Sequence, residues 1–106
     1  MVEIVPVVKD EVRFLGIAVY LPKCTMRMLF NREIMIVDSC FDVKAMEERC
    51  SVNIIQCMSG SFEKMFEQTV LCVSKGAMND GIHPGMSVKE AMECVFSQKE
   101  KSEEFF

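Results

Sequence analysis

The sequence predicts an α+β fold, a single two-layer domain in which a mixed or antiparallel sheet of five to six strands carries about three helices. Three observations lead to this prediction: apolar residues alternate along the first third of the chain, they recur at helical spacing after Asp38, and a helix-capping pattern precedes the last apolar stretch. Because 106 residues are too few for two separate cores, residues 1–106 form one domain. We expect residues 97–106 to be a polar tail, although Phe105 and Phe106 leave open that it docks on the domain.

The first third of the chain has the pattern of four strands. Residues 2–8 are rich in β-branched side chains, and Pro6 marks an edge or a bulge because proline has no amide hydrogen to donate. Residues 12–21 are apolar at both sets of alternating positions, which is typical of a strand inside a sheet that is at least partly covered on both sides. Residues 24–30 alternate as in a half-buried strand, and with residues 34–37 they predict a hairpin.

The rest of the chain favours short helices between strands. The expected order is a helix capped by Asp42, a strand over residues 52–57, a short helix from Phe62, a strand over residues 69–73 and one helical turn within residues 74–80. Ser87 and Glu90 then form a capping box, in which each side chain accepts a hydrogen bond from the other residue's amide. Apolar residues at helical spacing from Val88 to Phe96 follow, so this is the longest predicted helix.

Charge and hydropathy exclude two classes of partner. Lys and Arg number 12 against 16 Asp and Glu, a net charge of −4, whereas proteins that neutralise many phosphates carry a basic surplus. No apolar run approaches the roughly 20 residues of a membrane span. We therefore expect a cytoplasmic protein that binds neither nucleic acid nor membranes.

Six cysteines among 106 residues are unusual, and their spacing is informative. No pair has the C-x-x-C spacing of a zinc knuckle or a thioredoxin-like redox site, so we predict no metal and no cofactor. An even count leaves a disulfide framework open, but most of these cysteines lie among apolar residues. That setting favours reduced thiols that pack as small hydrophobic side chains.

Cys40, Asp38 and Asp42 are the candidates for catalysis. Cys40 lies just before a predicted helix, and a helix N-terminus favours the thiolate form of cysteine. The two carboxylates are close enough in sequence to act as an acid–base pair or to hold a hard cation. The alternatives are structural: a packed thiol at Cys40, a helix cap at Asp42 and a strand end at Asp38.

Two loops are candidates for ligand binding. Ser59, Gly60 and Ser61 lie between a strand and a helix, where their amides are suited to an anion, but the loop lacks a lysine and phosphate-loop glycine spacing. A turn with a serine cap is the alternative. His83 is the single histidine, in a turn rich in Gly and Pro, and it is either a lone metal ligand or an exposed turn residue.

Several of these motifs resemble the small YunC-like family of bacterial and archaeal proteins. The resemblance covers residues 12–95 and includes Leu21-Pro22-Lys23, Ile34-Met35 and Phe41-Asp42. Its most specific part is Gly81-Ile82-His83-Pro84-Gly85-Met86-Ser87-Val88-Lys89-Glu90-Ala91. The resemblance implies a compact α/β domain and no particular reaction.

The chain departs from that family at two motifs. Where family members have Met-Cys-Gly before the first helix, Asp38 and Ser39 occupy the Cys and Gly positions, and Cys40 lies two residues after the former. A family Gly-Val-Arg-Thr stretch is replaced by residues 58–61, which contain no arginine. Any chemistry that the family performs with these motifs is therefore in doubt for this chain.

Two functions from different classes remain open. The first is a non-catalytic binding or assembly module acting as a homo-oligomer, most simply a dimer, because a domain this small cannot bury every apolar residue. We expect Met26, Met28 and Tyr20 to lie in the exposed apolar patch that results. The second is a small enzyme that uses Cys40 with a neighbouring carboxylate. The sequence identifies neither a small-molecule ligand nor a reaction.

Overall fold

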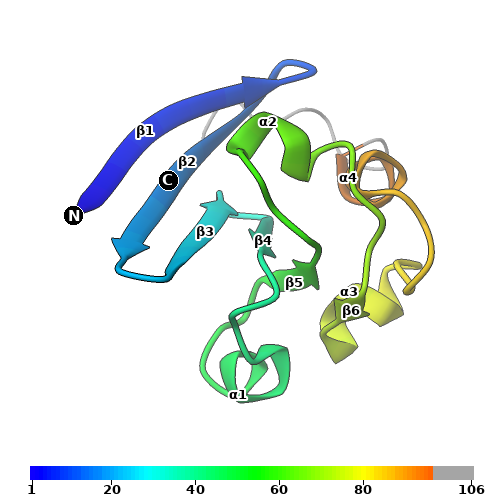
Figure 1. Cartoon of the computed structure of the whole chain (residues 1–106). Helices are drawn as coiled ribbons and strands as arrows, with labels where there is room; N and C mark the ends of the chain where they lie inside the picture. The colour runs from blue at the N-terminus through cyan, green and yellow to red at the C-terminus, as the bar shows by residue number, and fades with distance from the viewer. Residues whose placement is uncertain (97–106) are drawn as a thin grey trace.

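The computed structural model describes residues 1–96 and contains a six-stranded sheet with a helical layer (Figure 1). The strands are β1 (Val2–Lys9), β2 (Val12–Leu21), β3 (Cys24–Phe30), β4 (Ile34–Val37), β5 (Asn53–Gln56) and β6 (Cys72–Val73), and they lie in that order across the sheet. Only β4 and β5 are parallel neighbours, so the sheet is mixed. The predicted α+β class is confirmed, whereas the predicted polar tail lies outside the described residues.

Four helices occur in residues 1–96, one more than the sequence predicted. They are α1 (Val43–Glu47), α2 (Phe62–Met65), α3 (Lys75–Asn79) and α4 (Val88–Phe96). The additional helix is α3, where one helical turn was expected. Its N-cap Ser74 accepts hydrogen bonds from the amides of Ala77 (3.3 Å) and Ile54 (3.0 Å), so one buried hydroxyl joins α3 to β5.

The hairpin that joins β1 to β2 has a two-residue loop. Asp10 and Glu11 both have positive φ angles, 51° and 67°, as the type I′ turn requires. Met1 and Tyr20 exchange backbone hydrogen bonds of 2.8 and 3.4 Å, which places the odd-numbered amides of β1 toward β2. The backbone amides of the even-numbered residues therefore point to the free edge of the sheet. Pro6 is one of these residues, so its missing amide hydrogen breaks no hydrogen bond between strands.

The last strand is shorter than the predicted span of residues 69–73. The residues before it pair with two different segments. The Val70 amide donates to the carbonyl oxygen of Met86, and the Leu71 amide donates to that of Gln56. Thr69 forms an isolated bridge with Ser87. Only Cys72 and Val73 pair with β5 in regular register, so the apolar pattern extends beyond the strand itself.

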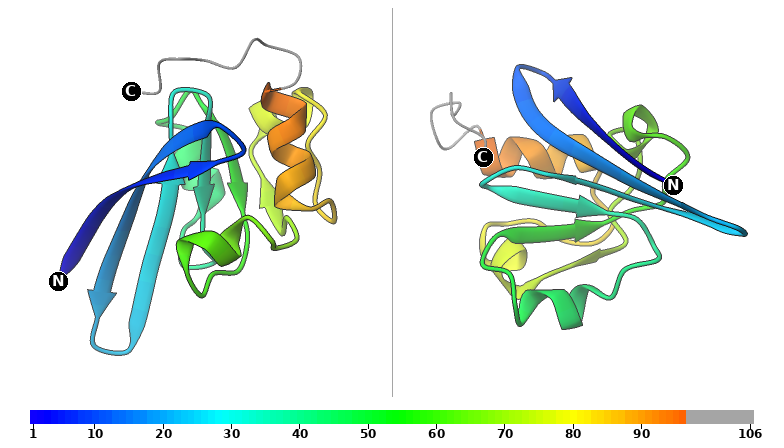
Figure 2. Two further views of the ribbon diagram at one scale, coloured as in Figure 1. Left: turned by 90° about the horizontal axis from the view of Figure 1, so that it is seen from above. Right: turned by 90° about the vertical axis from the view of Figure 1, so that its left-hand side faces the viewer.

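The main hydrophobic core lies between one face of the sheet and helices α2 and α4 (Figures 1 and 2). We call this face the covered face, and its strands contribute Val12, Phe14, Leu29, Ile34, Ile36 and Ile55 to the core. Helix α4 contributes five buried side chains to it, and its capping box is confirmed because the Glu90 amide donates to the Ser87 hydroxyl over 3.0 Å.

A second, smaller core lies on the opposite face, beneath α1. It contains Val37, Val43 and Ile54, with partly buried residues such as Met28 and Met35 around it. Helix α1 has only five residues and covers only the β4–β5 part of this face. Within residues 1–96, no helix has the length and apolar character that a membrane crossing requires.

Candidate functional site

Asp38 is a buried carboxylate at the end of β4, with an exposed fraction of 2%. Its Oδ2 accepts a hydrogen bond from the Arg27 amide (2.7 Å), and its Oδ1 accepts one from the Cys40 amide (2.9 Å). The Ser59 hydroxyl donates to Oδ2 over 3.4 Å. Because these donors come from β3, from the chain after β4 and from the loop before α2, Asp38 holds three segments together.

Cys40 is exposed, and its surroundings disfavour the reactive thiolate. The negative charge of Asp38 is the largest influence that raises the pKa of the Cys40 thiol, and the neighbouring Cys24 thiol adds to the effect. Helix α1 begins only at Val43, with Asp42 as its N-cap, so Cys40 lies outside the first helical turn. The neighbouring carboxylate that the enzyme hypothesis requires therefore opposes ionisation of the nucleophile.

Cys57 lies near Asp38 as well, a proximity that the sequence spacing does not indicate. Burial raises the pKa of the Cys57 thiol to about 12, and the Asp38 charge adds to that rise. Its Sγ donates to the Met65 carbonyl over 3.8 Å. Cys57 is a packed thiol, and all six cysteines are free in the structure.

The other predicted candidates around this cluster act as caps. Asp42 accepts from the Ala45 amide (3.2 Å) at the start of α1, and Ser61 accepts from the Lys64 amide (3.1 Å) at the start of α2. Gly60 lies between Ser59, which bonds Asp38, and the cap Ser61. With only four residues, α2 has too short a row of amides to form an anion site.

His83 lies in an exposed turn between α3 and α4. Its Nδ1 is 3.0 Å from the Pro84 carbonyl oxygen, and its amide donates to the Met86 sulfur over 3.5 Å. Gly81 and Gly85 on either side have φ angles of +91° and +97°, a conformation that favours glycine. In the described part of the chain, no three His, Cys, Asp or Glu side chains are placed to hold a metal ion.

The most extensive feature is an apolar sheet face on β1–β3, opposite α2 and α4, which we call the open face. Cross-strand register and alternation place twelve residues on it: Val2, Ile4, Pro6, Val8, Leu15, Ile17, Val19, Leu21, Cys24, Met26, Met28 and Phe30. Val2, Ile4 and Val8 are each about 60% exposed, and most of the β2 and β3 residues are half-buried. The β2–β3 end of this region projects away from the helices (Figure 2).

Tyr20 was expected in the same patch, and the structure places it elsewhere. Its register partner Thr25 and its alternation with Val19 put Tyr20 on the covered side of the sheet, beyond the helices. Its hydroxyl donates to Glu3 over 2.8 Å, and the Arg27 guanidinium lies 6.0 Å from the centre of its ring. Since a one-residue step changes the face of a strand, composition alone could not assign this residue correctly.

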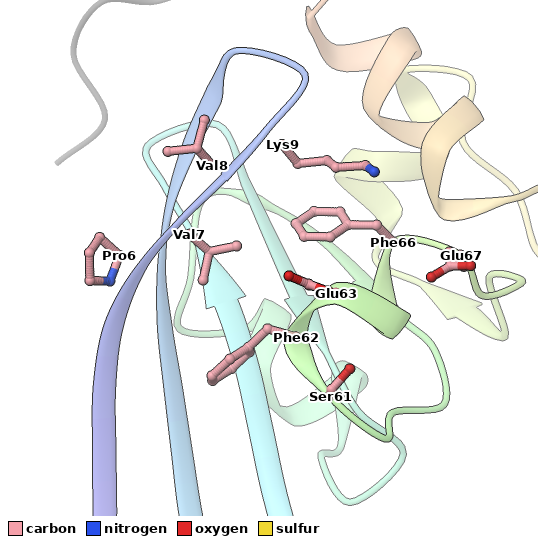
Figure 3. Close-up of a pocket in the computed structure, with 9 residues that line it drawn as sticks. All are labelled: Pro6, Val7, Val8, Lys9, Ser61, Phe62, Glu63, Phe66 and Glu67. Atoms are coloured by element: carbon pink, nitrogen blue, oxygen red, sulfur yellow. The ribbon is translucent and has the colours of Figure 1, made fainter.

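A cleft of about 680 Å³ between β1 and α2 was not predicted from the sequence (Figure 3). It includes Lys9 from β1 and Glu63 and Glu67 from the α2 region. These segments lie far apart in the sequence, so no local motif marks the cleft. The only sequence signal is the acidic pair Glu63 and Glu67, four residues apart, beside the aromatic residues of α2.

The comparisons with known proteins find a similar fold and identify no activity. No protein-family model matches the sequence, and no curated protein matches it. The crystal structure of a protein of unknown function from Thermoplasma acidophilum is similar, with a TM-score of 0.78 over 91% of this chain and 94% of that one. The sequence identity is 12%, so the similarity demonstrates a shared fold alone.

Proposed function

We propose that this protein is a non-catalytic assembly module that forms a homodimer through its open face. The observation that carries the proposal is the continuous apolar surface on β1, β2 and β3. Arg13, at one end of β2, is the charged residue that shares this side of the sheet. A second copy of the same surface is a suitable partner because it is equally apolar, with Arg13 at the margin rather than the centre.

The size of the open face supports this choice. Strand β2 has ten residues, and strand rise and spacing give the three-stranded surface a flat extent of about 30 by 15 Å, or about 450 Å². Side-chain relief makes the accessible area larger. The flat extent alone lies within the roughly 300–600 Å² that the largest apolar patch of a typical monomer covers, and a standard interface buries about 800 Å² on each partner. The open face therefore supplies more than half of one side of such an interface.

Pro6 favours pairing through the face over pairing along the edge. The even-numbered positions of β1 face the free edge of the sheet, and Pro6 has no amide hydrogen in the middle of that row. A second strand added there would lack a ladder hydrogen bond, which is a common protection against edge-to-edge association. The side chain of Pro6, in contrast, adds apolar area to the open face.

Three further properties of the protein belong to the same proposal. The raised pKa of the Cys40 thiol supports a non-catalytic role over the enzyme alternative. The six free cysteines support a reducing, cytoplasmic location. Membership of the YunC-like family is supported by the motif over residues 81–91, which forms a glycine turn followed by a capped helix.

Light scattering at micromolar concentration tests the dimer. We expect a mass twice the 12.1 kDa of one chain for the natural protein. Ile17 lies near the middle of the open face, so Ile17→Lys brings a charge into the interface and yields 12.1 kDa. Leu71→Lys is the matched control, because Leu71 is 48% exposed outside the open face and its variant keeps the dimer mass. A natural protein of 12.1 kDa would contradict the proposal.

A further inference from the structure

The cleft between β1 and α2 has the size of a small-molecule site (Figure 3). Its volume is about 680 Å³, and ligand pockets usually measure about 300–1,000 Å³. Pro6 and Val8 border both this cleft and the open face, whereas the α2 side chains belong to the cleft alone. A ligand here would therefore meet the proposed dimer interface only at Pro6 and Val8.

The floor of the cleft is apolar and held in place by the core. The Phe62 ring lies over Gly16, so closely that a Cβ on Gly16 would be 3.1 Å from two of the ring carbons and 3.2 Å from a Val7 methyl group. The Phe66 ring packs against Phe14 with a centroid distance of 5.4 Å. Because both rings have fixed supports, the floor exists before any ligand binds.

The rim carries three charged side chains without a partner among the described residues 1–96. Within residues 1–96, no hydrogen bond or ion pair engages the carboxylates of Glu63 and Glu67 or the ammonium group of Lys9. Glu63 is exposed on α2, and Glu67 is exposed in the turn just after the C-cap Phe66. Two carboxylates and one ammonium leave the rim with a charge of 1 − 2 = −1.

We propose that this cleft binds a small organic cation, an ammonium or guanidinium group on an apolar body. The carboxylates of Glu63 and Glu67 provide the opposite charge for the cationic head. The half-buried Phe62 ring attracts cations through the electron density of its face, and with Val7 it provides apolar contact for the body, above the buried Phe66. Lys9 lowers the affinity for a cation by repulsion.

Titration of the full-length protein with phenethylammonium tests this proposal, followed by amide chemical shifts. With phenethylammonium we expect saturable chemical-shift changes at Val7, Phe62 and Phe66. At the same concentration, the neutral phenethyl alcohol and the anionic 3-phenylpropionate should give changes at least tenfold smaller. The double variant Glu63→Gln, Glu67→Gln should weaken phenethylammonium binding at least tenfold. Lys9→Met removes the competing cation and should strengthen it severalfold.

Glu48→Gln is the control for nonspecific attraction. It removes one negative charge at the exposed C-cap of α1, away from the cleft, and should leave the affinity unchanged. Equal binding of the alcohol and the ammonium, or equal weakening by Glu48→Gln and the double variant, would overturn the proposal. Preferential binding of 3-phenylpropionate would overturn it in favour of an anion site at Lys9. The dimer test is unaffected by any of these results.

Discussion

The two faces of β2 are both apolar, yet one is buried in the fold and the other is only partly covered. On the covered face, Phe14 is 1% exposed in the core beneath the helical layer, and Ala18 is fully buried further along the strand. On the open face, Leu15, Ile17 and Val19 remain half-buried, with the exposed β1 residues Ile4 and Val8 beside them. Four short helices are enough to cover one face and the β4–β5 part of the other. The remaining apolar surface is the physical reason to expect a second copy.

The largest expected effect separates the two faces within a single strand. Leu29 is fully buried on the covered face of β3, so Leu29→Ala removes packed core atoms and should lower the free energy of unfolding by about 2–5 kcal/mol. Met26 lies on the open face of the same strand and is half-buried. Met26→Ala should cost less than about 1 kcal/mol in dilute protein, where no partner covers it.

Urea unfolding of both variants at two protein concentrations provides the measurement. The loss from Leu29→Ala should be the same at both concentrations, because the covered face is part of each chain's own core. The loss from Met26→Ala should grow as the concentration rises, since association buries this side chain. Equal losses from the two variants in dilute protein would show that the faces are not energetically different.

Asp38 connects β3 to the segment that leads into α1. Its substitution should have the next largest effect on stability. Asp38→Asn loses charge-assisted hydrogen bonds to the amides of Arg27 and Cys40 and should cost about 1–3 kcal/mol of unfolding free energy in a urea melt. Asp42→Asn is the control, because Asn is also a good N-cap and a substitution there should change the stability by only a few tenths of a kcal/mol.

The same substitution should make Cys40 more reactive. Asp38 raises the pKa of the Cys40 thiol by charge repulsion, so its replacement by Asn lowers that pKa and increases the thiolate fraction at a fixed pH. Alkylation of Cys40 by iodoacetamide at pH 8 should become severalfold faster in Asp38→Asn and stay unchanged in Asp42→Asn. A slower reaction after Asp38→Asn would mean that the carboxylate activates the thiol, as the enzyme hypothesis requires.

A smaller effect is expected at the cap of the helix that covers the sheet. Ser87→Ala removes the hydroxyl that accepts from the Glu90 amide and should lower the free energy of unfolding by about 0.5–2 kcal/mol. The unfolding midpoint in urea reports this loss. Ser39→Ala, at an exposed loop position, is a suitable control and should leave the midpoint in place. An unchanged midpoint for Ser87→Ala would argue that packing alone fixes α4.

Local patterns predicted the elements better than their faces and neighbours. The capping box at Ser87, the cap at Asp42 and the edge position of Pro6 depend on nearby residues, so the sequence was sufficient to find them. The face of Tyr20 depends on exact register, and the proximity of Cys57 to Asp38 depends on how β4 and β5 pair. Such tertiary relations have no signature in sequence spacing.

The candidate site shows the same division. The sequence marked Asp38 as a catalytic candidate with a strand end as the alternative; the structure places it directly after β4, and nothing in the sequence indicates the donors that surround its carboxylate. The cleft of Lys9, Glu63 and Glu67 was missed entirely because β1 and α2 meet only in the folded chain. An exposed apolar patch, in contrast, followed from length and composition, because small domains have too little interior for so many apolar residues.

The most direct test of the central claim, that a second copy covers the open face, uses the protein's own methionines. Met26 and Met28 lie on the open face, whereas Met58 and Met78 are 52% and 57% exposed elsewhere. After brief peroxide treatment, mass spectrometry should show Met26 and Met28 oxidised more slowly in the natural protein than in Ile17→Lys, with the protection lost on dilution. Met58 and Met78 should react equally in both proteins. Equal oxidation of Met26 and Met28 in the two proteins at every concentration would contradict the claim.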